Sequence, residues 1–262
     1  MFESLFDVPL WIAGPAIILA LCLFAVIGLL VVRRHVLPRL RVHSEDSEFS
    51  GAMLQSVMVF YGLAVALIAV SVWQTYGDTS KLASQEAASL ASLYRDVGLY
   101  PEPQRSELQL AIREHLDNII HNDWPLQQKG RVPAVKTETV ARVRRTLISF
   151  EPTTEAQKLQ HGETLHALNE AINAARLRID SVNTGLPGVL WLIVGAGAFI
   201  SLSSSFFFKV NDVRLHVIEV VLLAVFIGLV IFMISALDRP FRGDLGIRSD
   251  PYQLVYDQLM KQ

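Results

Sequence analysis

The feature that most constrains the fold is a long stretch without charge in the first third of the chain. Residues 53–72 contain no charged side chain. A charged group at the centre of a membrane helix costs about 2.5 to 3.5 kcal/mol, so a stretch of this length without one indicates a helix inside a lipid bilayer. The apolar stretch runs through residues 53–75 and passes, without a proline, into an Ala-, Ser- and Leu-rich segment at 77–97. We therefore predict one uninterrupted helix over residues 53–97.

Three further stretches are also long and apolar enough to span a bilayer, at residues 9–32, 186–208 and 217–237. A single such stretch is compatible with a buried helix of a soluble protein, but four of them argue against that alternative. Composition agrees, because 18% of the 262 residues are charged, whereas a soluble domain contains about 25%. The sequence predicts four transmembrane helices in a lipid bilayer.

The segment between the second and third spans has a different character. Residues 77–185 are polar and contain helical apolar stripes, which predict helices over the end of the first long helix, over 104–121, over 135–149 and from about 153 to 182. Thr153 or Thr154 is the expected cap of the last of these. Residues 98–103, 123–125 and 130–133 are expected to be breaks or loops. The predicted fold is all-α, with a helical-bundle soluble domain inserted between the second and third spans.

This pattern divides the chain into four parts. They are a first transmembrane hairpin at residues 1–76, a soluble helical domain at 77–185, a second transmembrane hairpin at 186–237 and a C-terminal tail at 238–262.

Charge distribution predicts the orientation. Arginines cluster after the first span, at Arg33, Arg34, Arg39 and Arg41, and the short loop at 209–214 is also net positive. Short loops rich in Lys and Arg stay in the cytoplasm. We therefore expect a multi-pass membrane protein with the soluble domain and both termini outside the cytoplasm.

The second predicted span has a stripe of small and polar residues at helical spacing, continuing to Tyr76. We call its membrane part the small-residue stripe: Gln55, Val59, Gly62, Ala66, Ala69 and Trp73. Two interpretations are open. The stripe faces a pore, or it is an ordinary contact between neighbouring helices, which small residues favour in membranes.

Several function classes find no support in the sequence. The net charge of −2 provides no basic surface for nucleic acid. The lone Cys22 can form neither an internal disulfide nor a cysteine-based zinc cluster. The sequence has no phosphate-binding glycine loop, no metalloprotease motif and no nucleophile elbow. We therefore expect no enzymatic activity, no cofactor and no metal.

The most distinctive motif follows the last span, with LDRPFRGDLGI at residues 237–247 and DPY at 250–252. It occurs together with EAASLASLYR at 86–95, DWP at 123–125, RLR at 176–178 and LPGVLW at 186–191. In these motifs, from about residue 50 to 259, the chain resembles a bacterial membrane family of unknown function that is called bestrophin-like. The motif residues that we select, and interpret as mainly structural, are Glu86, Arg95, Trp124, Arg176, Arg178, Pro187, Trp191, Asp238, Pro240, Phe241 and Gly243.

The resemblance implies a four-span helical protein and, by remoter analogy with bestrophins, a homo-pentameric anion channel whose second span lines the pore. The chain lacks the Ile-Pro-Phe neck of bestrophins and an acidic calcium clasp after the fourth span. Bestrophins also keep their soluble part in the cytoplasm, opposite to the side that the charge pattern predicts here.

Two functions remain open from the sequence. The first is a homo-oligomeric ion channel, with anions preferred over cations. The second is a non-conducting membrane scaffold whose soluble bundle binds a protein or the cell envelope.

Overall fold

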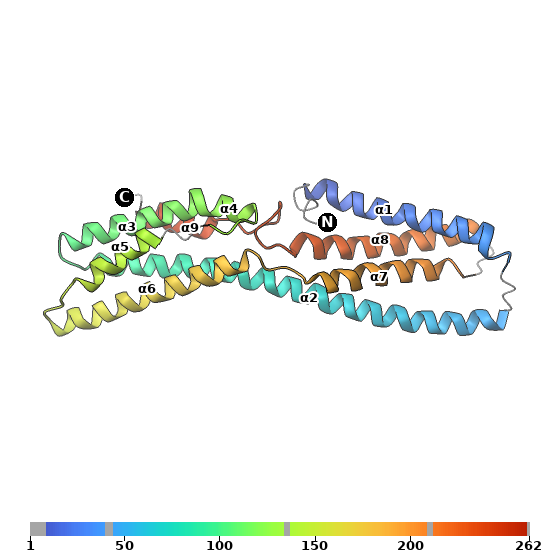
Figure 1. The fold of residues 1–262 in the computed structure, drawn as a ribbon, viewed down its shortest axis with the longest axis horizontal. Coiled ribbons are helices and arrows are strands. Elements are labelled where there is room, and N and C mark those ends of the chain that lie inside the picture. Colours follow the sequence, from blue (N-terminus) through green and yellow to red (C-terminus); the bar gives the residue numbers. More distant parts are fainter. Residues whose placement is uncertain (1–8, 40–43, 134–136, 209–211, 261–262) are drawn as a thin grey trace. The chain divides into compact units, whose positions relative to one another are not determined.

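The computed structural model describes residues 9–39, 44–133, 137–208 and 212–260, and no strand occurs among them. The α-helices are α1 (Leu10–Val31), α2 (Ser44–Val97), α3 (Gln104–Asn118), α4 (Trp124–Gln128), α5 (Thr137–Ile148), α6 (Glu155–Ser181), α7 (Gly188–Ser205), α8 (Val213–Leu237) and α9 (Asp250–Val255) (Figure 1). Short π-helical turns follow three of them, at Val32–Val36, Ile119–Asp123 and Tyr256–Met260.

Four helices in the described part of the chain are long and apolar enough to cross a membrane: α1, α2, α7 and α8. The all-α class and the four apolar spans are therefore confirmed. The long uninterrupted helix predicted for residues 53–97 lies within α2.

The chain forms two compact units, which are described separately. The first, the span unit, comprises Met1–Gln74 and Gly185–Asp238. The second, the bundle unit, comprises Thr75–Thr184 and Arg239–Gln262, so the C-terminal segment belongs with the polar helices. Helix α2 contributes residues to both units.

In the span unit, α1 packs against α8 and α7. Small residues permit close contact, since a Cβ on Gly14 would lie 3.1 Å from the ring of Phe232. Helix α2 meets α7 where the ring of Tyr61 covers Gly197, and the Tyr61 hydroxyl donates a hydrogen bond to the carbonyl oxygen of Val194 at 3.0 Å.

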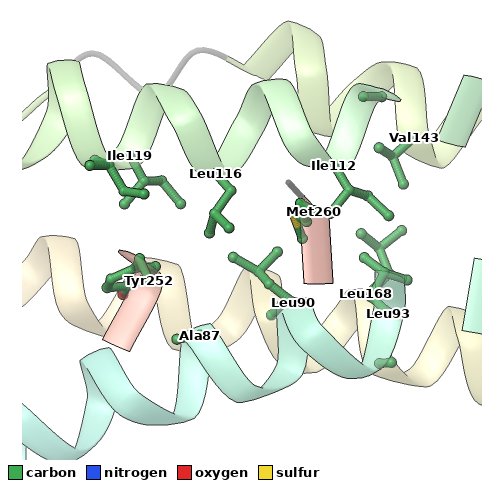
Figure 2. Close-up of a cluster of buried hydrophobic side chains, with 14 of the residues drawn as sticks. Ala87, Leu90, Leu93, Ile112, Leu116, Ile119, Val143, Leu168, Tyr252 and Met260 are labelled. Atoms are coloured by element: carbon green, nitrogen blue, oxygen red, sulfur yellow. The ribbon is translucent and has the colours of Figure 1, made fainter. Parts of the chain in front are cut away.

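In the bundle unit, apolar stripes of α2, α3, α5 and α6 meet in one core. Figure 2 shows Leu90 of α2 facing Leu116 of α3 inside this core. Helix α6 begins with a capping box, in which Thr154 accepts the backbone N–H of Gln157 at 3.1 Å. Such a cap satisfies backbone donors that have no partner within the helix.

The loop predicted at residues 123–125 is wrong. Asp123 ends a π-helical turn, and α4 begins at Trp124 with Pro125 in its first turn. Proline is tolerated there because the first N–H groups of a helix have no acceptor within it. The buried Trp124 side chain anchors the turn.

Candidate functional site

Five motif residues from four separate stretches of the sequence converge in the bundle unit. We call them the motif cluster: Glu86 of α2, Trp124 of α4, Arg178 of α6, Tyr252 of α9, and Phe241. Each is at most 2% exposed. Buried charged side chains are rare unless they are paired, so the contacts inside the cluster determine what it can do.

An ion pair forms the centre of the cluster. Arg178 donates through Nε to Oε2 of Glu86 at 2.6 Å and through Nη2 to Oε1 at 3.2 Å. The Tyr252 hydroxyl donates to the same Oε2 at 2.9 Å. This bidentate pairing is the strong form of an arginine–carboxylate contact.

Aromatic rings enclose the pair. The Arg178 guanidinium lies 5.5 Å from the ring centroid of Trp124 and 5.8 Å from that of Tyr252. Trp124 also meets the Phe241 ring edge-on at 5.6 Å, and its indole N–H donates to the carbonyl oxygen of Ile247 at 3.1 Å. The segment after the last span is thus held to the bundle core by rings and hydrogen bonds.

The electrostatics of the cluster shift the pKa values of Arg178 and Tyr252. Burial alone would lower the pKa of Arg178, but the carboxylates of Glu86 and Asp123 raise it above the usual value. Burial, reinforced by the Glu86 charge, raises the pKa of Tyr252 well above its ordinary value. Tyr252 therefore remains a neutral hydrogen-bond donor. A permanently charged Arg178 and a neutral Tyr252 phenol favour a structural role for the cluster over proton transfer.

The other C-terminal motif residues shape the path of the chain. Asp238 accepts the backbone N–H of Leu186 at 2.6 Å within the span unit. Pro240 accepts the N–H of Ile247 through its carbonyl at 2.8 Å. Gly243 has a positive φ of 75°, which side chains rarely adopt. Pro240 and Gly243 thus form part of a tight turn that brings Phe241 and Ile247 to Trp124.

The remaining motif residues are not members of the cluster. Arg95 and Arg176 are exposed on α2 and α6, Pro187 precedes the first residue of α7, and Trp191 is half-buried on α7. Tyr252, by contrast, joins the cluster although it was not among the selected residues. The DPY motif at 250–252 was the only sequence signal for it.

The small-residue stripe lies on an open face of α2. Gln55, Gly62 and Ala66 are exposed, as are Val59 at 64% and Trp73 at 65%, while Ala69 is half-buried. The face of α2 that is buried within the chain is a different one, formed by Val65, Ile68 and Val72. A single chain leaves the stripe uncovered.

The polar residues of the described chain form no group of three or more His, Cys, Asp or Glu that could hold a metal ion. In the span unit His216 is buried, and a hydrogen bond of 3.1 Å joins its Nε2 to the carbonyl oxygen of Ser205. In the bundle unit Asp117 and His121 form an exposed pair at 3.0 Å.

Comparison with known proteins completes the assignment. A family model described as a bestrophin-like domain matches residues 19–252. A search of curated protein sequences returned no match. Among solved structures, a mutant bacterial bestrophin homologue from Klebsiella pneumoniae is similar with a TM-score of 0.65 and 12% identity, over 95% of this chain and 99% of that chain.

A second mutant of the Klebsiella pneumoniae homologue has a TM-score of 0.60 and 12% identity, over 93% of this chain and 97% of that chain. A crystal structure of a variant membrane protein has a TM-score of 0.66 and 12% identity, with the same coverage. At this identity the likeness shows the fold alone. Because the family model matches most of the sequence, this chain, with its four apolar helices, belongs to the bestrophin-like family of membrane proteins.

Proposed function

We propose that the protein is a homo-oligomeric ion channel of a bacterial inner membrane, that it prefers anions, and that the small-residue stripe of α2 lines its pore. The observation that carries the proposal is the exposure of this stripe beside a separate, buried face of the same helix. Family membership and the bestrophin resemblance support the pentameric state.

The packing of the span unit favours a pore formed between subunits. Its core is filled by side chains with no exposure at all, including Ala25, Leu29, Leu202 and Ala224. Interiors packed in this way leave few voids larger than a water molecule. A water-filled path therefore needs several copies of α2 around a common axis.

The chemistry of the stripe favours anions. It contains no carboxylate, and its polar groups are the Gln55 amide and the Trp73 indole N–H. Cation channels commonly use rings of Asp or Glu. Neutral N–H donors can replace part of the hydration shell of an anion.

Flux through reconstituted protein tests the proposal. Ala66→Trp adds an indole to the stripe and is expected to reduce chloride flux into liposomes at least tenfold. Leu67→Trp is the matched control, because Leu67 is exposed at 64% beside the stripe. Unchanged flux in Ala66→Trp, at equal protein incorporation, would refute the pore assignment.

The orientation remains part of the proposal, with the bundle unit and both termini outside the cytoplasm. Ser149 is exposed in the bundle unit. Ser149→Cys should react with a membrane-impermeant maleimide in spheroplasts with intact membranes, in a chain whose Cys22 is replaced by Ala. Labelling only after lysis would place the bundle in the cytoplasm instead.

One observation favours the second function, a non-conducting scaffold. The motif residues concentrate in the bundle unit and not on the stripe. A scaffold predicts no flux in any variant and a partner recovered by crosslinking through an exposed bundle residue. Flux that Ala66→Trp abolishes would exclude it.

A further inference from the structure

A cavity of about 390 Å³ lies inside the bundle unit, between α2, α3, α5 and α6. Small-molecule sites in proteins have volumes of about 300 to 1,000 Å³ and mostly apolar walls with a few polar groups. At about 30 Å³ for each water in the liquid, the space equals roughly 13 waters. A ligand body of about a dozen non-hydrogen atoms would fit.

The walls of the cavity are apolar and come from all four helices. They include Leu90 and Leu93 of α2, Ile112 of α3, Val143 of α5 and Leu168 of α6. Figure 2 shows these side chains projecting into the same region between the helices. An apolar ligand body is therefore the chemistry that the walls would accept.

One acid that lines the cavity, Glu86, is buried and paired with Arg178, and a second, Asp123, is half-buried. Glu86 is hydrogen-bonded to Arg178 and Tyr252, and Asp123 acts electrostatically on Arg178. Nη1 of Arg178 is itself buried and has no hydrogen-bond partner among the described residues. Burial lowers the pKa of His115, a further lining residue, which favours its neutral form. Over the whole lining, the three carboxylates of Glu86, Asp123 and Asp180 are matched by three arginines.

Two arginines mark the exposed side of the cavity. Arg144 of α5 and Arg176 of α6 both line it and are both exposed. Neither forms an ion pair with a residue in the described part of the chain. Asp180 is the one exposed acid in the lining, against these two guanidinium groups. Guanidinium groups match the planar geometry of carboxylates.

We propose that this cavity binds a small amphipathic carboxylate, with its head at Arg144 and Arg176 and its apolar body between Leu90, Ile112 and Leu168. The site is separate from the small-residue stripe and does not rest on the proposed channel function. It assigns the exposed arginine of the RLR motif, Arg176, to ligand binding, while Arg178 maintains the fold.

Calorimetric titration of the full chain in nanodiscs tests the proposal, with octanoate as the probe and empty nanodiscs as the reference. Octanoate should bind, and Arg144→Ala or Arg176→Ala should weaken it at least tenfold. The matched control is Arg145→Ala, because Arg145 is exposed on the same helix but does not line the cavity. It should change affinity less than twofold.

Two further comparisons test the apolar part and the charge. Ala175 lines the cavity and is only half-buried, so Ala175→Trp should fill the space and abolish binding while thermal unfolding confirms a folded chain. Octylammonium and inorganic phosphate should each bind at least tenfold more weakly than octanoate. The proposal would be overturned if octanoate did not bind, or if octylammonium or phosphate bound as tightly as octanoate. It would also be overturned if Arg145→Ala weakened octanoate binding as much as Arg144→Ala or Arg176→Ala.

Discussion

Glu86 and Arg178 carry opposite charges at a position in the bundle core where neither side chain is more than 1% exposed. Desolvation of two ions is expensive, and their pairing with good geometry only offsets it. The pair therefore adds little net stability when it is intact, but the loss of one partner leaves a buried unpaired charge and destabilises the fold. The two charges are therefore tolerated in the core only when α2 and α6 are aligned so that Glu86 meets Arg178.

Glu86→Gln is predicted to destabilise the bundle by about 3–5 kcal/mol, because it leaves the Arg178 charge buried without its counter-ion. Thermal unfolding followed by tryptophan fluorescence measures the change. Glu163→Gln, on an exposed position of α6, is the control and should stay within about 0.5 kcal/mol. Equal transition temperatures for wild type and Glu86→Gln would show that the pair is dispensable.

The buried His115 should make the free energy of unfolding depend on pH. Burial lowers the pKa of His115 below its usual 6.5, with Glu86 opposing and Arg178 reinforcing the shift. The unfolded chain then binds more protons than the folded one near pH 6.5, so the free energy of unfolding falls as the pH drops through that value. Unfolding measured between pH 5 and 8 should show this decline.

His115→Gln should flatten that decline, because the glutamine does not titrate. The control is His166→Gln, at an exposed position that pairs with Glu170 at 3.3 Å. That change should not flatten it. A decline of the same slope in His115→Gln would assign the proton uptake to another group.

At the scale of helices, the contact between α2 and α7 depends on a glycine, Gly197, because its lack of a side chain leaves room for the Tyr61 ring. A Cβ on Gly197 would overlap the ring of Tyr61, whereas nothing lies within 4 Å of a Cβ on Gly195 in the same helix. Overpacking a close contact costs about 1–3 kcal/mol. The two glycines therefore provide a matched pair.

Gly197→Ala is predicted to lower the thermal transition of the membrane-embedded protein by separating α2 from α7. Gly195→Ala should leave it unchanged or raise it, because alanine is the better helix former by about 0.5–1 kcal/mol. Transition temperatures in the same nanodiscs provide the measurement. Equal effects of both changes would mean that the Tyr61 contact does not hold the two helices together.

Much of the helical pattern was predictable, because the relevant signals are local. High hydropathy with few charged residues locates all four spans, and the position after Pro152 narrows the cap to Thr153 or Thr154, of which Thr154 forms it. Residues 123–125 were misjudged because proline marks both loops and first turns of helices. Only the burial of Trp124, a long-range effect, decides between the two.

The motif cluster was only partly predictable. Residues nine apart on a helix lie on opposite sides, at about 100° per residue, so Glu86 and Arg95 lie on opposite sides of α2. The same reasoning separates Arg176 from Arg178. The pairing of Glu86 with Arg178 and Tyr252 spans 92 and 166 residues, and no local pattern reports contacts over such distances.

At the scale of the whole molecule, the exposed stripe of α2 predicts assembly. Native mass spectrometry of the protein in nanodiscs should give a closed ring of about five subunits. Ala66→Trp, which alters the stripe, should preserve that number if its effect on flux is a block of the pore. A monomeric wild type would remove the basis for a pore between subunits.

The position of Tyr252 in the chain has a consequence for biosynthesis. Glu86 and Arg178 are synthesised before α9. The nascent bundle therefore lacks the Tyr252 hydroxyl that donates to Glu86, and the buried Met260, until the end of the chain is made. A premature stop codon before Tyr252 would give a truncated protein that contains every span but whose Glu86–Arg178 ion pair is exposed to solvent. Such products should be preferred substrates of membrane quality-control proteases.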